Sequence, residues 1–229
     1  MVKLLLENGG NINSPDELKW TALHMASWKG HIDIVKLLLE NGANCDLPAK
    51  HGYTALYLAS DSGHIGMVKL LLENGASVDR KTDHDWTPLF IASYHGNVDL
   101  IKLLLNKGPS ANSIHLSNGR SVLSHTAAKG DINVVGCLLQ AGADPNSSDY
   151  LSRTPLFYAT MSGSLESLDI LLSEGNVSIN SRDHYGSTLL SIATRHGHIG
   201  LVAHLLAFGE IEMNTKDNFD DTEGGDDDC

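Results

Sequence analysis

Cysteine is scarce in this sequence. The 229 residues include three cysteines, Cys45, Cys137 and Cys229, which lie far apart and form no Cys-x-x-Cys pair. A sparse and odd number of thiols is typical of reduced proteins and not of secreted disulfide scaffolds. We therefore expect an intracellular protein, located in the cytoplasm or the nucleus.

The chain also lacks an excess of positive charge and a long apolar run. Its 16 Lys and Arg residues against 28 Asp and Glu residues give a formal net charge of −12. Because nucleic acids and membrane surfaces are polyanions, this balance argues against binding to either. No segment approaches the roughly 20 apolar residues of a membrane-spanning helix, and the first seven residues are too short and too charged for a signal peptide.

The familiar catalytic motifs are missing as well. The sequence has no Gly-x-x-x-x-Gly-Lys-Ser/Thr loop, no Gly-x-Ser-x-Gly elbow and no His-Glu-x-x-His pair. The 12 histidines are spread along the chain, several of them beside glycine as in Gly30-His31, Gly63-His64 and Gly197-His198. A zinc site needs three or four converging ligands. We therefore expect no enzyme, no catalytic residue, no metal site and no cofactor.

What the chain does have is an internal repeat of 33 to 34 residues. A Thr or Ser followed two residues later by Leu recurs at Thr21, Thr54, Thr87, Ser121, Thr154 and Thr188. Nine residues after each comes a glycine, at positions 30, 63, 96, 130, 163 and 197. Another glycine follows 21 residues after each, at positions 42, 75, 108, 142, 175 and 209. Chance does not place twelve glycines in register.

Each repeat predicts two helices and a loop. The Thr or Ser caps a first helix by accepting a hydrogen bond from a free N–H, and Pro88 and Pro155 fit its first position. The first glycine ends this helix as a left-handed cap, and a second helix such as Ile34-Val-Lys-Leu-Leu-Leu follows with apolar residues at helical spacing. Turn formers such as His51-Gly52 and Asn118-Gly119 then predict a β-hairpin.

The pattern of Thr-Pro-Leu-x-x-Ala, Gly-His and Leu-Leu-Leu-x-x-Gly-Ala resembles the ankyrin repeat. The resemblance covers roughly residues 1–216, as a partial repeat at residues 1–13 followed by six repeats. It implies an all-α fold, an ankyrin-repeat solenoid of stacked antiparallel helix pairs with projecting β-hairpins.

The two ends of the chain depart from this pattern. Met1–Gly9 corresponds to a second helix without its first, which indicates either a fragment of a larger polypeptide or a native start with an irregular cap. Seven of the 28 acidic residues fall in residues 217–229, which contain no Lys or Arg, so residues 1–216 carry 21 acidic against 16 basic groups. We expect residues 217–229 to be an acidic, disordered tail.

The fourth repeat departs most from the pattern. It carries Ser121, Val122 and Thr126 where the repeat pattern has Thr, Pro and Ala, and Gly136 lies inside its second helix. Glycine inside a helix costs about 1 kcal/mol relative to alanine. We expect this repeat to be the least stable, and hydrogen exchange with residues 113–146 protected longest would contradict that.

The resemblance implies a binding surface at the loop tips and on the exposed side of the first helix. These are positions −4, −3, −1, +7 and +8 relative to each capping Thr or Ser, and they include all three tryptophans and four of the six tyrosines. Exposed aromatic residues and arginine are the side chains that most often anchor interfaces. The candidate partner-binding residues are Trp20, Trp28, Tyr53, Trp86, Tyr94, His51, His84, His95, Arg120, Arg153 and Arg195.

Aromatic candidates cluster in the first three repeats and arginines in the last three. This distribution predicts a concave groove with an aromatic N-terminal half and a more cationic C-terminal half. The alternative is that each aromatic residue packs on its neighbour and stiffens the stack of hairpins.

Three functions are compatible with these patterns. The first is a monomeric protein–protein interaction module, part of a larger polypeptide, that binds another protein through the groove. The second is a non-classical enzyme or small-molecule binder, with His51, His84, His95 and Asp61 in proton transfer beside Trp86 and Tyr94. The third is a structural spacer or an inhibitor that covers a partner's site.

Overall fold

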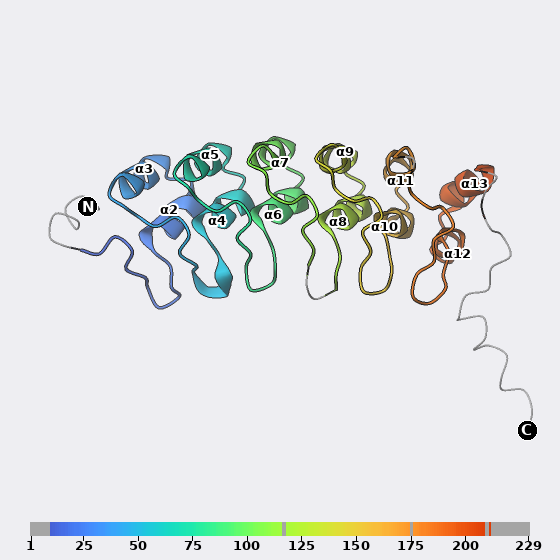
Figure 1. Ribbon diagram of the computed structural model, residues 1–229, viewed down its shortest axis with the longest axis horizontal. Helices are drawn as coiled ribbons and strands as arrows, with labels where there is room; N and C mark the ends of the chain where they lie inside the picture. Colours follow the sequence, from blue (N-terminus) through green and yellow to red (C-terminus); the bar gives the residue numbers. More distant parts are fainter. Residues whose placement is uncertain (1–9, 116–117, 175, 209–210, 212–229) are drawn as a thin grey trace, which may run out of the picture. The chain divides into compact units, whose positions relative to one another are not determined.

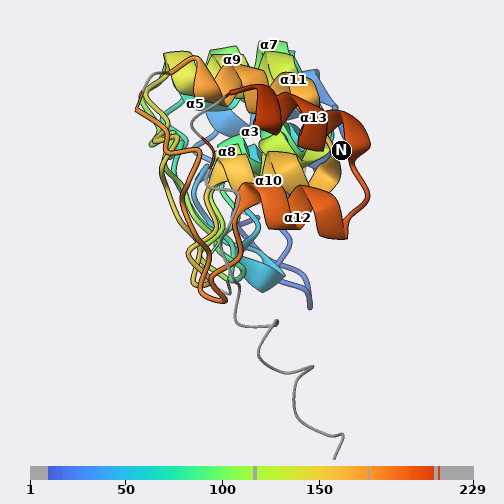
Figure 2. The same ribbon diagram turned by 90° about the vertical axis from the view of Figure 1, so that its right-hand side faces the viewer.

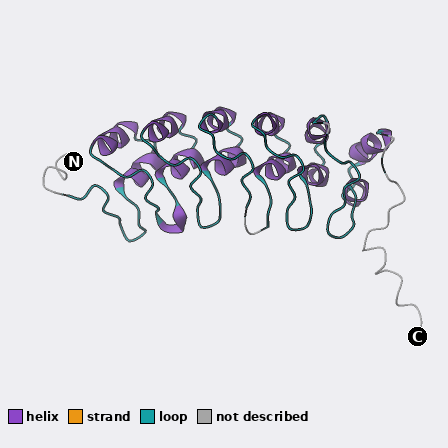
Figure 3. Ribbon diagram, viewed as in Figure 1, coloured by secondary structure: helices purple, strands orange, loops and turns teal. Residues whose placement is uncertain are grey.

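The computed structural model describes residues 10–115, 118–174, 176–208 and 211. The chain divides into two compact units, residues 1–113 (unit 1) and residues 114–229 (unit 2). Both units are all-α in their described parts, as the sequence predicts (Figure 3).

Each unit is built from successive pairs of helices. The helices of unit 1 are α2 (Ala22–Lys29), α3 (Ile32–Glu40), α4 (Ala55–Asp61), α5 (Ile65–Glu73), α6 (Pro88–His95) and α7 (Val98–Leu105), with a short 3-10 turn η1 (Lys50–Gly52). Those of unit 2 are α8 (Val122–Lys129), α9 (Ile132–Gln140), α10 (Pro155–Ser162), α11 (Leu165–Leu172), α12 (Leu189–Arg195) and α13 (Ile199–Ala207).

Within each unit the helices form two layers. In unit 1, α4 packs between α2 and α6 in one layer, and α5 packs between α3 and α7 in the other (Figure 1). In unit 2, α10 packs between α8 and α12, while α9 contacts α11. The long loops leave the ends of the first-helix layer on one side of each unit (Figure 2). Loops and first helices therefore share a continuous surface within a unit.

The Thr and Ser residues begin the first helices as predicted. The side-chain oxygens of Thr54, Thr87 and Ser121 each accept a hydrogen bond at 3.1 Å from the backbone N–H three residues ahead. Thr188 does the same at 3.3 Å. Two caps differ: the Thr21 hydroxyl lies 2.9 Å from His24 Nδ1, and the buried Thr154 hydroxyl has no hydrogen-bond partner in the described structure. Pro155 follows Thr154, but Pro88 follows Thr87 in the same way and Thr87 is capped, so the proline does not explain the missing bond.

The glycines and the small residues explain how the layers fit together. The first glycine of every repeat adopts a left-handed backbone, with φ of 77° at Gly30 and 80° at Gly163. A side chain at Gly163 would place its Cβ 2.8 Å from the ring of His198, so only glycine fits at this position. The residue at the sixth position is buried in all six repeats, at Ala26, Ala59, Ala92, Thr126, Ala159 and Ala193.

The loops are tighter than the β-hairpins that the sequence predicts. Each closes through a backbone hydrogen bond such as that from Ala49 N to Tyr53 O at 2.8 Å. The described residues contain no β-strand and one isolated antiparallel bridge, between Ile114 and Ser121. A single bridge or loop-closing hydrogen bond does not form the ladder of hydrogen bonds that defines a β-strand. Neighbouring loops are joined instead, as by Lys50 N donating to Leu18 O at 2.9 Å.

Parts of both predicted ends lie outside the described residues. This applies to residues 1–9 of the partial repeat and to the acidic segment at residues 217–229. The second glycines Gly175 and Gly209, and Cys229, lie outside them too. Among the described helices, none is long and apolar enough to cross a membrane.

The fourth repeat gives a test of local stability at Gly136. A Cβ at this position of α9 would meet Ile170 Cδ1 at 3.5 Å, an ordinary van der Waals distance. Gly136→Ala should therefore raise the unfolding free energy by about 0.5–1 kcal/mol, because alanine loses less backbone freedom on folding. Urea unfolding followed by circular dichroism measures the change.

The matched control is Gly130→Ala in the same repeat. Gly130 has φ of 74°, and its Cβ would lie 3.1 Å from Ser164 Oγ, so this variant should lose stability. A Gly136→Ala variant as unstable as Gly130→Ala would show that the helix does not tolerate the methyl group.

Candidate functional site

The candidate aromatic residues of unit 1 divide into exposed and half-buried sets. Trp28 and Tyr94, near the ends of α2 and α6, are each 40% exposed. His51, His84 and His95 are also exposed. Trp20, Tyr53 and Trp86, which directly precede the capping threonines, are half-buried. Position along the repeat therefore separates these side chains by exposure.

The half-buried rings contribute to the packing of unit 1. Trp20, Tyr53 and Trp86 pack against a buried cluster of Tyr57, Leu58 and Ile91. Ring centroids lie 5.1 Å apart for Tyr53 with Tyr57, and 5.1 Å for Trp86 with Phe90. Aromatic pairs at this spacing add to the energy of burial. These three rings therefore pack on their neighbours, as the packing interpretation of the aromatic residues expects.

An aromatic hollow of about 400 Å³ lies between the first two repeats. Trp20 and Trp28 meet edge to face, with centroids 5.7 Å apart and planes inclined by 75°. Exposed apolar side chains continue the surface, with Leu18 at 51% and Met25 at 45% exposure. We call this feature the aromatic hollow; its lining residues are Asp16, Leu18, Trp20, Met25, Trp28, Tyr53, Tyr57, Leu58 and Asp61.

The electrostatics of the aromatic hollow are acidic. Two carboxylates, Asp16 and Asp61, line it, and no Lys or Arg is among its lining residues. Asp61 Oδ1 lies 2.9 Å from His95 Nε2, and the Asp16 Oδ1 atom accepts hydrogen bonds from two N–H groups of its own loop. Burial raises the pKa of Tyr57 well above its usual range, and the nearby Asp61 carboxylate adds to this. Tyr57 therefore remains a neutral phenol at physiological pH.

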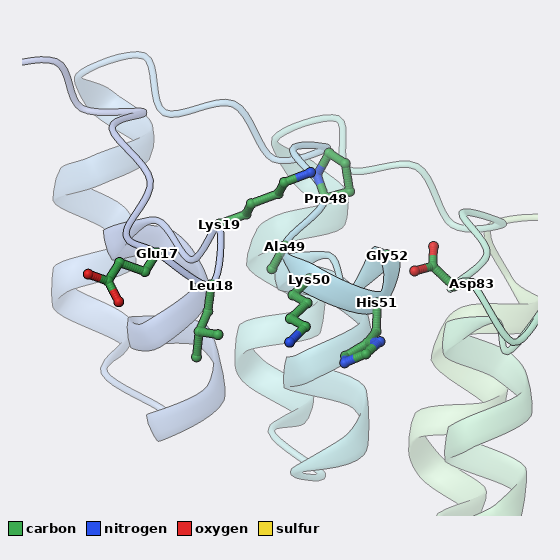
Figure 4. Close-up of a pocket in the computed structure, with 9 residues that line it drawn as sticks. All are labelled: Glu17, Leu18, Lys19, Pro48, Ala49, Lys50, His51, Gly52 and Asp83. Carbon is green, nitrogen blue, oxygen red and sulfur yellow. The ribbon is translucent and has the colours of Figure 1, made fainter.

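A second, more polar hollow lies at the loop tips. Its volume is about 530 Å³, and its charged lining is mixed, with Lys19, Lys50, Glu17 and Asp83 (Figure 4). In Figure 4 the Leu18, Lys50 and His51 side chains point to one side, and the Lys19 side chain extends toward Pro48. No Phe, Tyr or Trp side chain lines this hollow, which distinguishes it from the aromatic hollow.

The residues considered for proton transfer are distributed over both hollows. His51 lines the polar hollow and stacks on His84, with centroids 6.3 Å apart. Asp61 lines the aromatic hollow and pairs with His95 at a side-chain exposure of 39%. Among described residues, no group of three or more His, Cys, Asp or Glu side chains could hold a metal ion. Histidines beside glycine make structural contacts, as His64 Nε2 does with Trp28 O at 3.2 Å.

The arginine candidates of unit 2 differ from one another. The Arg120 guanidinium lies 3.8 Å from the Tyr158 ring centroid and donates to Ser124 O at 3.1 Å, and burial lowers its pKa. Arg153 donates to the buried carboxylate of Asp183 at 3.2 Å and is 20% exposed. Arg195 is exposed at the end of α12. The first two side chains thus contribute to the fold of unit 2.

Half-buried Tyr158 and His125 complete this part of unit 2. Tyr158 donates its hydroxyl to Asp149 Oδ2 at 2.6 Å, and burial together with this bond raises its pKa to about 12. Burial lowers the pKa of His125 to about 4, helped by Arg120, Lys129 and His115.

The low pKa of His125 predicts a loss of stability in acid. The unfolded state, with a histidine pKa of about 6.5, binds the proton more tightly than the folded state. The contribution of the neutral ring is therefore complete above pH ~6.5 and decreases as the pH falls toward 4. Since His125 is half-buried, we expect the loss from pH 7 to pH 5 to be on the order of 1 kcal/mol smaller in His125→Gln than in the parent chain.

Urea unfolding at the two pH values measures this difference. His24, whose pKa burial also lowers, remains in both proteins and cancels in the comparison. An equal loss of stability in the two chains would show that His125 is not protonated on unfolding in this range.

Comparison with known proteins agrees with this arrangement of repeated helix pairs. A family model described as ankyrin repeats, in three copies, matches residues 1–82, 79–149 and 130–217. The chain belongs to the ankyrin-repeat family. Ankyrin repeats generally mediate protein–protein interactions, and proteins of this family are typically non-enzymatic interaction modules.

A solved ankyrin structure supports the assignment. The chain resembles the crystal structure of the ankyrin repeat domain of Bcl-3, a member of the IkappaB protein family. The sequence identity is 25%, and the TM-score is 0.79. The match covers 90% of this chain and 90% of that chain. No curated protein matches the sequence.

The ankyrin pattern indicated part of the aromatic hollow and missed the rest. It indicated Trp20, Trp28 and Tyr53 as partner-binding residues. Asp61 was named only as a candidate for proton transfer. It missed Asp16, Met25, Tyr57 and Leu58, which also line the hollow. Helical spacing could have found Met25, because residues three apart share a face and Trp28 follows it by one turn.

Proposed function

We propose that this ankyrin-repeat chain binds a partner protein through the loops and first helices of unit 1, with the aromatic hollow as the anchor. The observation that carries the proposal is an apolar surface left open within an otherwise closely packed stack. Leu18, Met25 and Trp28 are each at least 40% exposed around one concave feature. Contiguous exposed apolar surface of this kind marks interaction sites.

The chemistry of the aromatic hollow suits a protein ligand. Tryptophan and tyrosine bury a large area with few rotatable bonds and are enriched among residues that dominate binding energy. The Trp20 ring is held by packing on the buried cluster, so it is fixed before a partner arrives. A rigid anchor of this kind reduces the ordering that binding requires.

The other candidate residues have secondary parts in this proposal. Tyr94, His95 and His84 extend the unit 1 surface beyond the aromatic hollow. Of the three candidate arginines in unit 2, Arg195 is exposed. Arg120 and Arg153 are half-buried and would contact a partner through their accessible atoms. We propose that the chain acts as a monomeric module inside the cell.

A pair of matched variants tests the proposal. Trp28→Ala alters the aromatic hollow, and Ile34→Ala removes a side chain of similar exposure, 38%, from the second helix α3. Cross-linking and mass spectrometry of the tagged parent chain from cell extract identifies partners. The parent and Ile34→Ala should recover the same protein, and Trp28→Ala should lose it.

Two results would contradict the proposal. One is a partner retained by Trp28→Ala and lost by Ile34→Ala, which would move the interface to the second helices. The other is the recovery of no protein partner at all by a folded parent chain.

A further inference from the structure

We propose that the aromatic hollow receives one lysine or arginine side chain of the partner. This inference rests on the proposed function and specifies the chemistry of the group that enters. The hollow combines aromatic walls with acidic groups, a combination that attracts a cation more than an apolar or an anionic side chain.

The walls provide the negative faces of several π systems. Trp20 and Trp28 stand nearly perpendicular to each other, and Tyr53 and Tyr57 are stacked with planes inclined by 16°. A cation within about 6 Å of an indole or phenol ring centroid is attracted by the ring quadrupole. The perpendicular indoles form a corner in which one ring face and one ring edge meet.

The acidic groups add charge complementarity. The hydrogen bonds of Asp16 and Asp61 use one oxygen of each carboxylate, Oδ1. Each Oδ2 atom is without a hydrogen-bonded partner among the described residues. The titratable side chains that line the hollow are these two carboxylates and the phenols of Tyr53 and Tyr57. His95, which pairs with Asp61, is the basic group next to it.

The chain contains cation–π contacts of its own, on the exposed Trp28 ring and on the half-buried Tyr158 ring. Lys29 Nζ lies 3.8 Å from the centroid of Trp28, although Lys29 is not among the residues that line the hollow. In unit 2 the Arg120 guanidinium lies at the same distance from the Tyr158 ring. A lysine and an arginine of this chain therefore each make a cation–π contact.

Other occupants fit the hollow less well. An apolar side chain would remove water from the Oδ2 atoms of Asp16 and Asp61 without replacing its hydrogen bonds, which is unfavourable. An acidic side chain would be repelled by both. A volume of about 400 Å³ lies at the low end of the range for small-molecule sites, which suits one long side chain.

The experiment uses the full chain and a pair of peptides that differ in charge. The probes are acetyl-Gly-Gly-Lys-Gly-Gly-amide and the same peptide with norleucine in place of lysine. The chain has three tryptophans, so ¹H–¹⁵N spectra at pH 7.5 follow three indole N–H signals. Trp20 and Trp28 line the hollow, and Trp86 lies outside it as an internal control.

We expect the lysine peptide to shift the Trp20 and Trp28 signals and leave Trp86 unchanged. The norleucine peptide should bind at least fivefold more weakly, and added salt should weaken the lysine peptide selectively. Equal binding of the two peptides, no binding of the lysine peptide, or equal shifts of all three indoles would overturn the proposal.

Two variants separate charge from shape. Asp61→Asn keeps the size of the side chain and should weaken the lysine peptide at least threefold, while Asp99→Asn on α7 should leave it unchanged. Equal binding of the lysine peptide by Asp61→Asn and Asp99→Asn would show that the Asp61 carboxylate does not contribute to binding.

This test and that of the proposed function fail differently. If the lysine peptide does not bind but Trp28→Ala still loses its partner, the cation site is wrong and the interface stands. If the peptide binds but partner recovery does not depend on Trp28, the cation site stands and the interface is wrong.

Discussion

Trp28→Ala should weaken the binding of the partner by about 2 kcal/mol or more, roughly 30-fold, while the chain remains folded. Trp28 is 40% exposed and borders the aromatic hollow, so its ring offers surface that a partner can cover. Truncation of a central aromatic residue typically has an effect of this size. Calorimetric titration with the partner identified by cross-linking measures it.

The stability of this variant is the control. Trp28 meets Trp20 edge to face but does not belong to the set of rings that pack on the buried cluster. The unfolding free energy should therefore fall by no more than about 1 kcal/mol. Trp28→Phe, which keeps an aromatic face, should recover most of the affinity. A variant that unfolds, or one that binds like the parent, would contradict this role for Trp28.

Trp86→Ala should have the opposite profile and reduce the unfolding free energy by about 2–4 kcal/mol. The half-buried Trp86 ring packs on the buried cluster and lies beside Phe90 and Tyr94, with centroids 5.1 and 5.8 Å away. Removing a large aromatic side chain loses its burial energy and leaves a cavity. Urea unfolding followed by circular dichroism measures the loss.

Trp86→Phe is the matched variant. It keeps a ring in the same place and should recover at least half of the lost stability. A change below about 0.5 kcal/mol in Trp86→Ala would show that the ring adds little to the packing. The two tryptophans together distinguish a binding role from a packing role for the aromatic side chains of unit 1.

The sequence predicts the helices well because their signals are local. Thr87 and Pro88 mark the start of α6, and Gly96 ends it with a left-handed backbone, so the bounds follow from three residues. The loops were predicted less well. His51-Gly52 indicates a turn, but whether the flanking residues form a strand depends on hydrogen bonds to neighbouring loops, such as that from Asp83 N to His51 O.

The candidate site depends on contacts that a single repeat does not specify. Arg120 and Arg153 occupy the same position of their repeats, yet Arg120 stacks on Tyr158 and Arg153 pairs with Asp183. Each contact is set by a residue of the following repeat region. The same reasoning explains why Tyr57 was missed, since Trp20 from the preceding repeat turns it into a wall of the hollow.

The central claim is that the partner covers the loops and first helices of unit 1 around the aromatic hollow. Amide hydrogen exchange of the full chain, free and with its identified partner, tests this most directly. We predict slower exchange in the complex over residues 16–29 and 49–61, with α3, α5 and α7 unchanged. Slower exchange confined to α3, α5 and α7 would place the partner on the second-helix layer and contradict the account.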